Sequence, residues 1–397
     1  MITDFKNCTG CRACEQQCSR NAIAMRADFE GFLYPKIDTE KCNNCGLCEK
    51  TCPMLRDDLQ NSVLETIAAK NLNKEQILRS ASGGVFAAIA EVILEQGGVV
   101  FGCAFDENIV AGHIFAENLN ELCKLQGSKY VQSDTKNTYS QAKEFLRQNR
   151  KVLYSGTPCQ VAGLKAFLGK DYENLITIDL ICHGVPSPKL FAKYIEWLGK
   201  KMGGRIIYYD FRNKEQGGWR YGLKAETEIK SEYLKTSLDP YLLSFSKKET
   251  LRECCYSCKY KCETRTGDLT IGDYWGIFSK KVHPDFFSRD GVSVILVNTH
   301  NGRKIFENIK NKVESIQSTF KNVTSTQANF KPSSIERPMI RDYIYNMDES
   351  FFKISLYRKL KSLVPDKIKK YLWEIRNALE SLMITYLGKF KNRGEPK

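Results

Sequence analysis

The residues of this sequence with the clearest capacity for chemistry are its sixteen cysteines. Eight fall within the first 52 residues, six fall between Cys159 and Cys262, and the other two, Cys103 and Cys123, stand apart. The chain opens Met-Ile-Thr-Asp-Phe-Lys, with neither the apolar segment nor the cleavage site of a secretory signal. We therefore expect a cytoplasmic location, where thiolates that bind metal are favoured over disulfides.

The eight early cysteines form an internal repeat. The spacing Cys-x2-Cys-x2-Cys-x3-Cys begins at Cys8 and recurs 34 residues later at Cys42, where the run ends in a proline. A cubane iron–sulfur cluster needs four converging thiolates, and cysteines three residues apart supply three of them from one loop. In two-cluster bacterial ferredoxins the last cysteine of each run ligates the opposite cluster. The sequence therefore predicts two 4Fe-4S clusters, one held by Cys8, Cys11, Cys14 and Cys52 and the other by Cys42, Cys45, Cys48 and Cys18.

Residues 1–55 thus resemble the two-cluster ferredoxin fold, with two departures. Ser19 stands where a proline is usual, and 23 residues separate Cys18 from Cys42, more than a minimal ferredoxin uses. Neither departure removes a ligand. The alternative, a pair of structural zinc sites, would typically show two paired thiols in each half. Because such clusters store single electrons and do little chemistry alone, we expect a second redox centre farther along the chain.

A polar linker over residues 56–65 precedes a segment, residues 66–320, in which predicted strands and helices alternate. Its apolar and β-branched runs predict strands over residues 99–105, 152–154, 175–182 and 292–298. Helices are predicted over residues 84–95, 159–168, 188–202 and 302–312. The alternation predicts an α/β core with a partly parallel sheet, to which the Tyr- and Lys-rich residues 205–235 add antiparallel strands.

Four loop motifs of this core carry polar groups suited to a ligand. Residues 80–84 (Ser-Ala-Ser-Gly-Gly) precede a helix, where free N–H groups beside glycines can meet a phosphate, although a serine helix cap would look the same. Residues 126–130 (Gln-Gly-Ser-Lys-Tyr) combine a turn, a cation and a ring. Residues 155–160 and 179–186 follow apolar strands, the usual position of ligand loops in α/β folds.

Further cysteines accompany these loops. Cys159 and Cys182 follow two of the predicted strands, which would put both thiols at one edge of the sheet. The later run Cys254-Cys255-x2-Cys258-x3-Cys262 supplies more. The alternative is that the first two are inert core thiols, since free cysteine is commonly buried. We hypothesise a third 4Fe-4S cluster on Cys159, Cys182, Cys255 and Cys258, with Cys254 and Cys262 as substitutes.

Together these segments resemble the family of beta subunits of coenzyme F420-reducing hydrogenases and dehydrogenases, over about residues 66–310. The resemblance implies a bound FAD, fed by iron–sulfur clusters, that passes a hydride to or from coenzyme F420 or another conjugated organic acceptor. A flavin suits this position because it can exchange single electrons with clusters and pairs with a hydride acceptor. The matching segments are Ser82-Gly83-Gly84, Gln126 to Tyr130, Gly156 to Gln160, Cys182-His183-Gly184 and Gly267 to Gly276.

On the strength of this resemblance we assign candidate flavin contacts. His183 is the candidate proton donor, since an imidazole titrates near neutral pH, although a histidine at a strand–loop junction is more often structural. Asp268 and Asp273 bind ribityl hydroxyls or cap a turn. The remaining cofactor-binding candidates are Ser82, Gly83, Gly84, Gln126, Gly127, Ser128, Lys129 and Thr157.

The net charge of +14 is concentrated at the end of the chain. Residues 351–397 hold twelve Lys and Arg against four Asp and Glu, a local charge of +8. We expect residues 333–397 to form a basic helical tail that either lies on an anionic membrane surface, docks on a partner or packs against the body. No basic stripe indicates nucleic-acid binding, and no apolar run is long enough to span a membrane.

The sequence thus predicts a ferredoxin-like domain over residues 1–55, a flavin-binding α/β core over residues 66–320 and the tail. Two functions remain open. The first is an iron–sulfur, flavin-dependent oxidoreductase with its own organic substrate. The second is a non-catalytic subunit that relays electrons between a hydrogenase or dehydrogenase, or a ferredoxin, and a soluble carrier.

Overall fold

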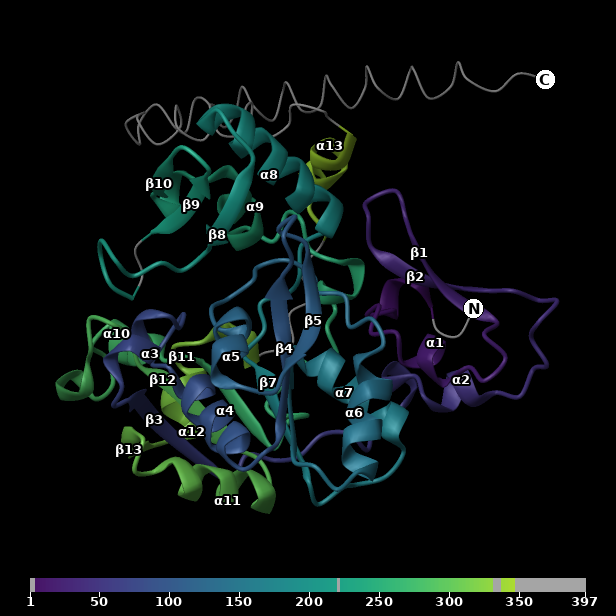
Figure 1. The fold of residues 1–397 in the computed structure, drawn as a ribbon, viewed down its shortest axis with the longest axis horizontal. Helices are drawn as coiled ribbons and strands as arrows, with labels where there is room; N and C mark the ends of the chain where they lie inside the picture. Colours follow the sequence, from purple (N-terminus) through teal and green to yellow (C-terminus); the bar gives the residue numbers. More distant parts are fainter. Residues whose placement is uncertain (1–3, 220–221, 331–336, 347–397) are drawn as a thin grey trace.

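The structure, a computed structural model, describes residues 4–219, 222–330 and 337–346. An N-terminal module lies beside a core built on an eight-stranded sheet, and a smaller three-stranded sheet with its helices covers one edge of that core (Figure 1). The mixed α/β architecture and the ferredoxin-like module match the prediction. The predicted tail lies outside the described residues except for residues 337–346, which include α13 (Ile340–Asn346).

The N-terminal module contains only short helices and strands, because its cysteine loops occupy much of its sequence. The 23 residues between Cys18 and Cys42 form an antiparallel hairpin of β1 (Ile23–Ala27) and β2 (Leu33–Ile37). The tip of this hairpin reaches the rest of the protein, where Ser187 Oγ donates to the main-chain oxygen of Glu30. The segment between Cys18 and Cys42, which is longer than in a minimal ferredoxin, therefore provides a contact with the core. The other elements are η1 (Phe5–Asn7), α1 (Ala13–Gln17), α2 (Leu47–Lys50) and η2 (Pro53–Leu55).

The large sheet has the strand order β13-β3-β12-β11-β7-β6-β4-β5. Its four central strands β4, β6, β7 and β11 run parallel, and every other neighbouring pair is antiparallel. The carboxyl ends of the parallel strands meet at one edge, which is where ligands bind in open α/β sheets. The strands are β3 (Glu65–Asn71), β4 (Val99–Phe105), β5 (Ala111–Ala116), β6 (Val152–Gly156), β7 (Leu175–Leu180), β11 (Leu269–Asp273), β12 (Ser293–Val297) and β13 (Val313–Ser318).

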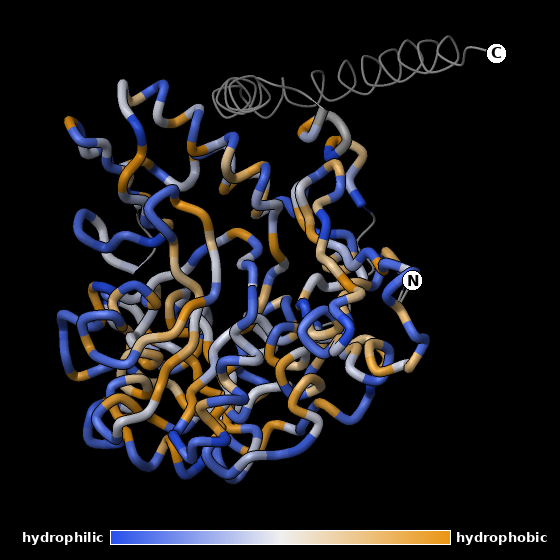
Figure 2. The backbone as a smooth tube through the Cα atoms, turned by 45° about the vertical axis from the view of Figure 1, so that its right-hand side comes forward, coloured by the Kyte–Doolittle hydropathy of each residue, from blue (hydrophilic) through white to orange (hydrophobic). Residues whose placement is uncertain are grey.

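Helices cover both faces of this sheet, and alternate residues of the central strands pack on opposite sides. Val100 and Leu153 pack with α4 (Val85–Glu95), α5 (Leu119–Leu125) and α11 (His300–Ile309). Phe101 and Tyr154 pack with α6 (Thr138–Arg147) and α7 (Pro158–Leu168) on the other face. Figure 2 shows the apolar chain segments concentrated in this layer. Smaller elements are α3 (Lys74–Leu78), α10 (Trp275–Phe278), η5 (Pro284–Phe286), α12 (Phe320–Thr324) and η6 (Ala328–Phe330).

The smaller sheet, order β10-β9-β8, is antiparallel as predicted and lies above the carboxyl edge of the large one (Figure 1). It packs with α8 (Pro188–Met202), α9 (Pro240–Ser246) and α13 around a core of aromatic side chains. No helix among the described residues combines the length and the apolarity that a bilayer span requires. The remaining elements are β8 (Ile206–Asp210), β9 (Leu223–Thr227), β10 (Ser231–Leu234), η3 (Thr236–Leu238) and η4 (Glu253–Cys255).

Candidate metal and cofactor sites

The first thiol set of the N-terminal module lines a single hollow. Cys8, Cys11 and Cys14 come from one loop, which turns through the left-handed residues Gly10 (φ 68°) and Arg12 (φ 62°), and Cys52 comes from the second run. Burial raises the pKa of Cys11 to about 12, and the neighbouring thiols add to the rise. Burial also raises the pKa of Cys14 and Cys52, and four thiols gathered in one hollow are suited to a metal centre, whose positive charge favours the thiolate form.

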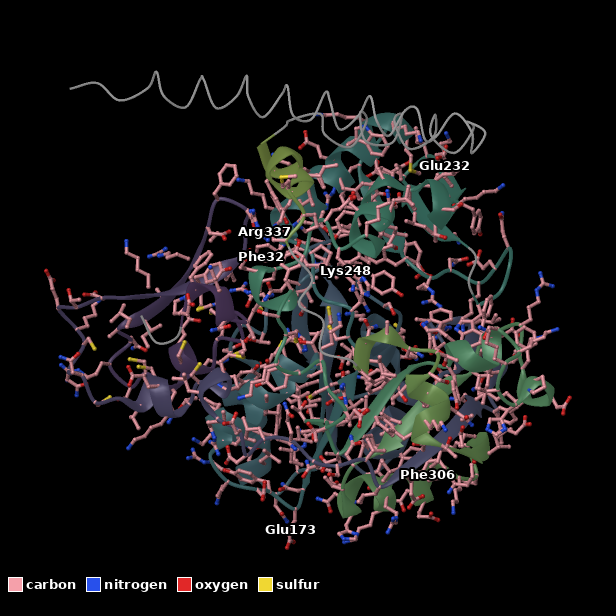
Figure 3. The ribbon with its side chains drawn as sticks, turned by 180° about the vertical axis from the view of Figure 1, so that it is seen from behind. Phe32, Glu173, Glu232, Lys248, Phe306 and Arg337 are labelled. Carbon is pink, nitrogen blue, oxygen red and sulfur yellow. The ribbon has the colours of Figure 1, made fainter. Side chains whose placement is uncertain are left out.

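The second thiol set of the module is more exposed. Cys18 and Cys48 pack with Ile23 in the same small apolar cluster that holds Cys14 and Cys52, so the two sets are neighbours. Cys45 is exposed, and Cys42 lies within electrostatic reach of Cys48. Cys52, from the second run, thus lies with the first set, and Cys18, from the first run, packs in one cluster with Cys48. Figure 3 shows the sulfur atoms gathered in this module.

The module sits directly on α7 of the core. At Gly163 an added Cβ would lie 2.8 Å from Tyr139 Oη and 3.0 Å from Cys11 Cβ, so this glycine leaves the room that the first cysteine loop occupies. Thr135 Oγ1 donates to the main-chain oxygen of Cys11 at 3.0 Å. The first set therefore faces the core, and the second faces away from it.

A third thiol set lines a cavity at the carboxyl edge of the large sheet. Cys159 lies in the first turn of α7, which follows β6, and Cys182 lies two residues beyond β7. Cys255 and Cys258 reach the cavity from the segment after α9. Each of the four lies within electrostatic reach of others in the set, and burial raises the pKa of Cys182 well above its usual value.

The two substitute cysteines differ in position. Cys254 lines the same cavity, and its hydrogen bond to Cys255 is the main cause that lowers the pKa of Cys255 to about 7. Cys262 instead contacts Gln60 and Thr264. The structure thus brings the four favoured cysteines together, with Cys254 as a fifth. Among the described residues, no group of three or more His, Cys, Asp or Glu side chains is arranged to hold a single metal ion.

Two of the other predicted residues lie at this cavity. Thr157 caps α7 and lines the cavity, with its Oγ1 3.2 Å from Cys159 Sγ. His183 also lines it, and its Nε2 is buried with no hydrogen-bond partner among the described residues. Burial, together with Lys248 and Lys261, lowers the pKa of His183 to about 4, so its ring is neutral near pH 7. That differs from the near-neutral pKa on which the predicted proton-donor role was based.

A second group of predicted residues meets around a buried arginine that the sequence did not single out. Arg212 donates to Asp273 Oδ2 at 3.0 Å, to Tyr130 Oη at 2.9 Å and to the main-chain oxygen of Ala81 at 3.1 Å. It therefore joins the loop of residues 80–84, the turn of residues 126–130 and the end of β11. Trp219 Nε1 also donates to Asp273, at 2.6 Å, so that carboxylate is already paired within the protein. We call this convergence of loops the Arg212 crevice.

The glycines of the loop of residues 80–84 allow this loop to pack closely against neighbouring strands. A Cβ on Gly83 would lie 2.6 Å from the main-chain oxygen of Ala69 and 2.7 Å from Ser293 N, because the loop is pressed against β3 and β12. Ser82 Oγ donates to the main-chain oxygen of Val292, and Gly84 caps α4 in the left-handed region. The absence of side chains at these positions is thus explained by close approach of the chain to itself.

Two lysines of the crevice, the buried Lys214 and the half-buried Lys129, donate to main-chain oxygens. In the turn of residues 126–130, in which Gly127 is left-handed, Lys129 Nζ donates to the oxygens of Lys124 and Gln126. Lys214 Nζ donates to the oxygens of Ile77 and Ser82, at 2.7 and 2.6 Å. Burial lowers the pKa of both, that of Lys214 to about 7. Among the described residues, neither forms an ion pair with a carboxylate.

The cavity and the crevice are linked by stacked rings. The ring of Tyr130 stacks on Phe245 at 5.1 Å between centroids, and His183 meets the same phenylalanine edge-on at 5.0 Å. Asp268 lies apart, at the opposite end of β11 from Asp273. Its carboxylate accepts from Thr177 and Thr299, which ties β7 to the start of α11. The structure therefore brings all the loop motifs to one edge but leaves Asp268 in a structural position.

Comparisons with known proteins agree with this organisation. Residues 149–321 match the model of the C terminus of the coenzyme F420 hydrogenase/dehydrogenase beta subunit, and residues 7–55 match a 4Fe-4S dicluster domain. A coenzyme F420-dependent sulfite reductase of Methanocaldococcus jannaschii is 26% identical over 329 residues, 79% of this chain and 47% of that protein. The chain therefore spans about half the length of that relative.

Two further proteins are similar. The F subunit of the F(420)H(2) dehydrogenase of Methanosarcina mazei is 20% identical over 321 residues, 78% of this chain and 84% of that protein. A chain of the F420-reducing [NiFe] hydrogenase complex from Methanosarcina barkeri superimposes with a TM-score of 0.45 at 17% identity, over 76% of this chain and 93% of that one. The family-model matches and these relatives confirm the predicted resemblance to coenzyme F420 hydrogenase/dehydrogenase beta subunits, over residues 149–321, and to a 4Fe-4S dicluster domain, over residues 7–55.

Proposed function

We propose that this chain is an iron–sulfur oxidoreductase that passes electrons between three 4Fe-4S clusters and FAD, and from there to coenzyme F420 or another conjugated organic acceptor. One observation carries the proposal. Three sets of four cysteines follow one another from the outer side of the module to the carboxyl edge of the core sheet, and the last set adjoins the Arg212 crevice.

The thiol sets fit the clusters in number and chemistry. Cys8, Cys11, Cys14 and Cys52 would hold the cluster that faces the core, and we call this group the inner set. The outer set is Cys18, Cys42, Cys45 and Cys48, and the core set is Cys159, Cys182, Cys255 and Cys258. When bound, the clusters supply single-electron transfer and the flavin supplies exchange of an electron pair with the organic acceptor.

The Arg212 crevice fits an anionic cofactor such as FAD. Burying an ammonium group without a carboxylate partner is costly, and a bound diphosphate would offset that cost. Lys214 is such a group, and the half-buried Lys129 is a second cation without a carboxylate partner among the described residues. We therefore assign Lys129 and Lys214 to binding of the FAD phosphates. The turn of residues 126–128, Ser82 and Thr157 would contact the rest of the cofactor. His183 would face the acceptor as a neutral hydrogen-bond donor.

The first test is the content of the protein purified without oxygen from iron-replete cells. The proposal predicts a yellow-brown protein from which acid releases about one FAD per chain. Reduction by dithionite, followed by a screen of organic acceptors for those that reoxidise the flavin, would identify the substrate class. A preparation that contains iron but releases no flavin would reject the FAD assignment and leave the cluster assignment standing.

The second candidate is a relay subunit without its own substrate. The similarity to the F subunit of the F(420)H(2) dehydrogenase, which covers 84% of that protein, favours this function, because that protein is one subunit of a dehydrogenase. The isolated chain distinguishes the two: steady turnover of an organic acceptor with an artificial electron donor supports the enzyme. Turnover that requires a partner protein supports the relay.

A further inference from the structure

Arg252 lies in the wall between the inner thiol set and the core set. Its side chain is fully buried. Nε donates to the main-chain oxygen of Cys8 at 2.7 Å, and Nη2 lies 3.7 Å from Cys8 Sγ. The same side chain lines the core cavity together with Cys254 and Cys255. One guanidinium therefore contacts the surroundings of both thiol sets.

Two other residues complete this wall. Thr9 lines the hollow of the inner set and also the core cavity. Tyr260 lines the core cavity, and its hydroxyl donates to the oxygen of Pro53, a residue of the inner hollow. The inner and core sets are thus separated by single side chains, whereas the outer set touches neither Arg252 nor Tyr260 in the described contacts.

The surroundings of Arg252 are built to hold a cation. Nη1 donates to Gln132 Oε1 at 3.0 Å and Nη2 to the oxygen of Leu33 at 2.8 Å, and the guanidinium lies 4.2 Å from the ring centroid of Tyr34. A Cβ at Gly10 would lie 2.8 Å from Nη1, so the glycine of the first cysteine loop leaves space for this group. Among the described residues no carboxylate pairs with it, and the ionisable groups that face it are the Cys254 thiol, the Tyr34 hydroxyl and the Cys8 and Cys255 thiols.

We propose that Arg252 is a shared counter-cation of the inner and core clusters, which favours their reduced forms and so sets the step at which electrons cross between the module and the core. This inference rests on the proposed cluster sites. A buried cation lowers the free energy of the more negative, reduced state, and an N–H···S hydrogen bond acts in the same direction. The step moves one electron, so one cluster is oxidised as the other is reduced and no bond is made or broken.

The test is a redox titration of the full-length protein followed by electron paramagnetic resonance. In Arg252→Met the equilibrium constant for reduction of the inner cluster should fall at least tenfold, about 59 mV for one electron. The core cluster should shift in the same direction, and the outer cluster should keep its potential and serve as the internal reference. Arg252→Lys, which keeps the charge but cannot reproduce the four contacts, should recover part of the shift.

Arg341 provides a matched control. It is also almost fully buried and also joins the module to the core, through Glu30 and Glu253, but it contacts no thiol. Figure 3 labels Phe32 and Arg337 at this junction. Arg341→Met should weaken the junction without moving the inner potential relative to the outer one. Equal shifts in the Arg252 and Arg341 variants, or unchanged potentials in Arg252→Met with full iron content, would overturn the proposal.

The number of clusters in the wild-type protein, measured as iron content, distinguishes failure of the Arg252 proposal from failure of the proposed function. If wild-type protein holds iron for only two clusters, the core assignment fails, and the inner potential still reports on Arg252. If Arg252→Met loses iron, Arg252→Lys supplies the measurement: potentials that stay closer to wild type than the tenfold change expected for a neutral side chain, despite loss of the Cys8 and Leu33 contacts, support a charge effect. Potentials displaced as far as expected for a neutral side chain would assign Arg252 a structural role and reject the proposal.

Discussion

Lys214→Met should change how the stability of this protein depends on pH. The side chain of Lys214 is only 4% exposed, and its ammonium group donates to two main-chain oxygens. Desolvation is the main cause that lowers its pKa from 10.5 to about 7, and the nearby Arg212 adds to it. The folded protein therefore releases this proton near neutral pH, whereas the unfolded chain keeps it to about pH 10.5.

The size of the effect follows from the difference between the two pKa values. Each pKa unit corresponds to about 1.4 kcal/mol, so the protonated side chain costs up to about 5 kcal/mol of folding free energy below pH 7. Because the unfolded state binds more protons between pH 7 and 10.5, stability rises with pH over that range. Between pH 7 and 9.5 wild type should gain about 3 kcal/mol from this group, and Lys214→Met should gain none of it.

The assay is anaerobic urea unfolding of both proteins, freed of bound flavin, across this pH range, with Lys151→Met as the matched control. Lys151 is an exposed lysine whose ammonium group contacts Gln96, so its replacement controls for the loss of a lysine side chain outside the crevice. Lys214→Met should also retain less FAD, because a cation is lost from the phosphate surroundings. Parallel stability curves for wild type and Lys214→Met would refute the argument.

Three further variants test separate parts of the structure. Cys182→Ser should lose about a third of the iron, from about twelve to about eight atoms per chain, and Cys262→Ser should lose none, as iron analysis would show. Asp239→Asn should flatten the pH dependence of unfolding between pH 4 and 6, because burial raises the pKa of Asp239 to about 6 and wild type loses about 3 kcal/mol as that carboxyl ionises on raising the pH. Denaturation of Gly83→Ala should show a loss of about 1–3 kcal/mol, since its Cβ would meet the Ala69 oxygen at 2.6 Å; unchanged stability would mean that the loop is looser than described.

The elements that the sequence predicted best are those whose signal is local. The helix of residues 188–202 and the strand of residues 99–105 have the predicted bounds, because proline, glycine and β-branched residues delimit them. Four strands of the large sheet were not predicted, β5, β13, β3 and β11, and the last two show why. Strand β3 is interrupted by alanines and a lysine, and β11 is five residues long and ends in Gly-Asp, so both depend on pairing within the sheet and on packing against its helices.

In the candidate site, too, the residues with a local sequence signal were predicted, and those whose role depends on long-range contacts were not. Cysteine spacing alone predicted the inner and outer groupings, because three ligands of each set come from one loop. Arg212, Lys214 and Arg252 escaped notice because their roles depend on contacts between segments far apart in the chain, such as Arg252 with Cys8. Gly83 is an error of the opposite kind, a residue given a role in binding that the structure explains otherwise. The sequence suggested a phosphate site at this glycine, whereas close packing of its loop on β3 and β12 accounts for it.

Metal and sulfide analysis of the full-length protein, purified without oxygen, tests the central claim most directly. Three thiol sets that hold 4Fe-4S clusters predict about twelve iron atoms and about twelve acid-labile sulfides per chain, with zinc absent in stoichiometric amount. Zinc bound without acid-labile sulfide would contradict the account, because the cysteines would then be structural ligands and no path for electrons would exist.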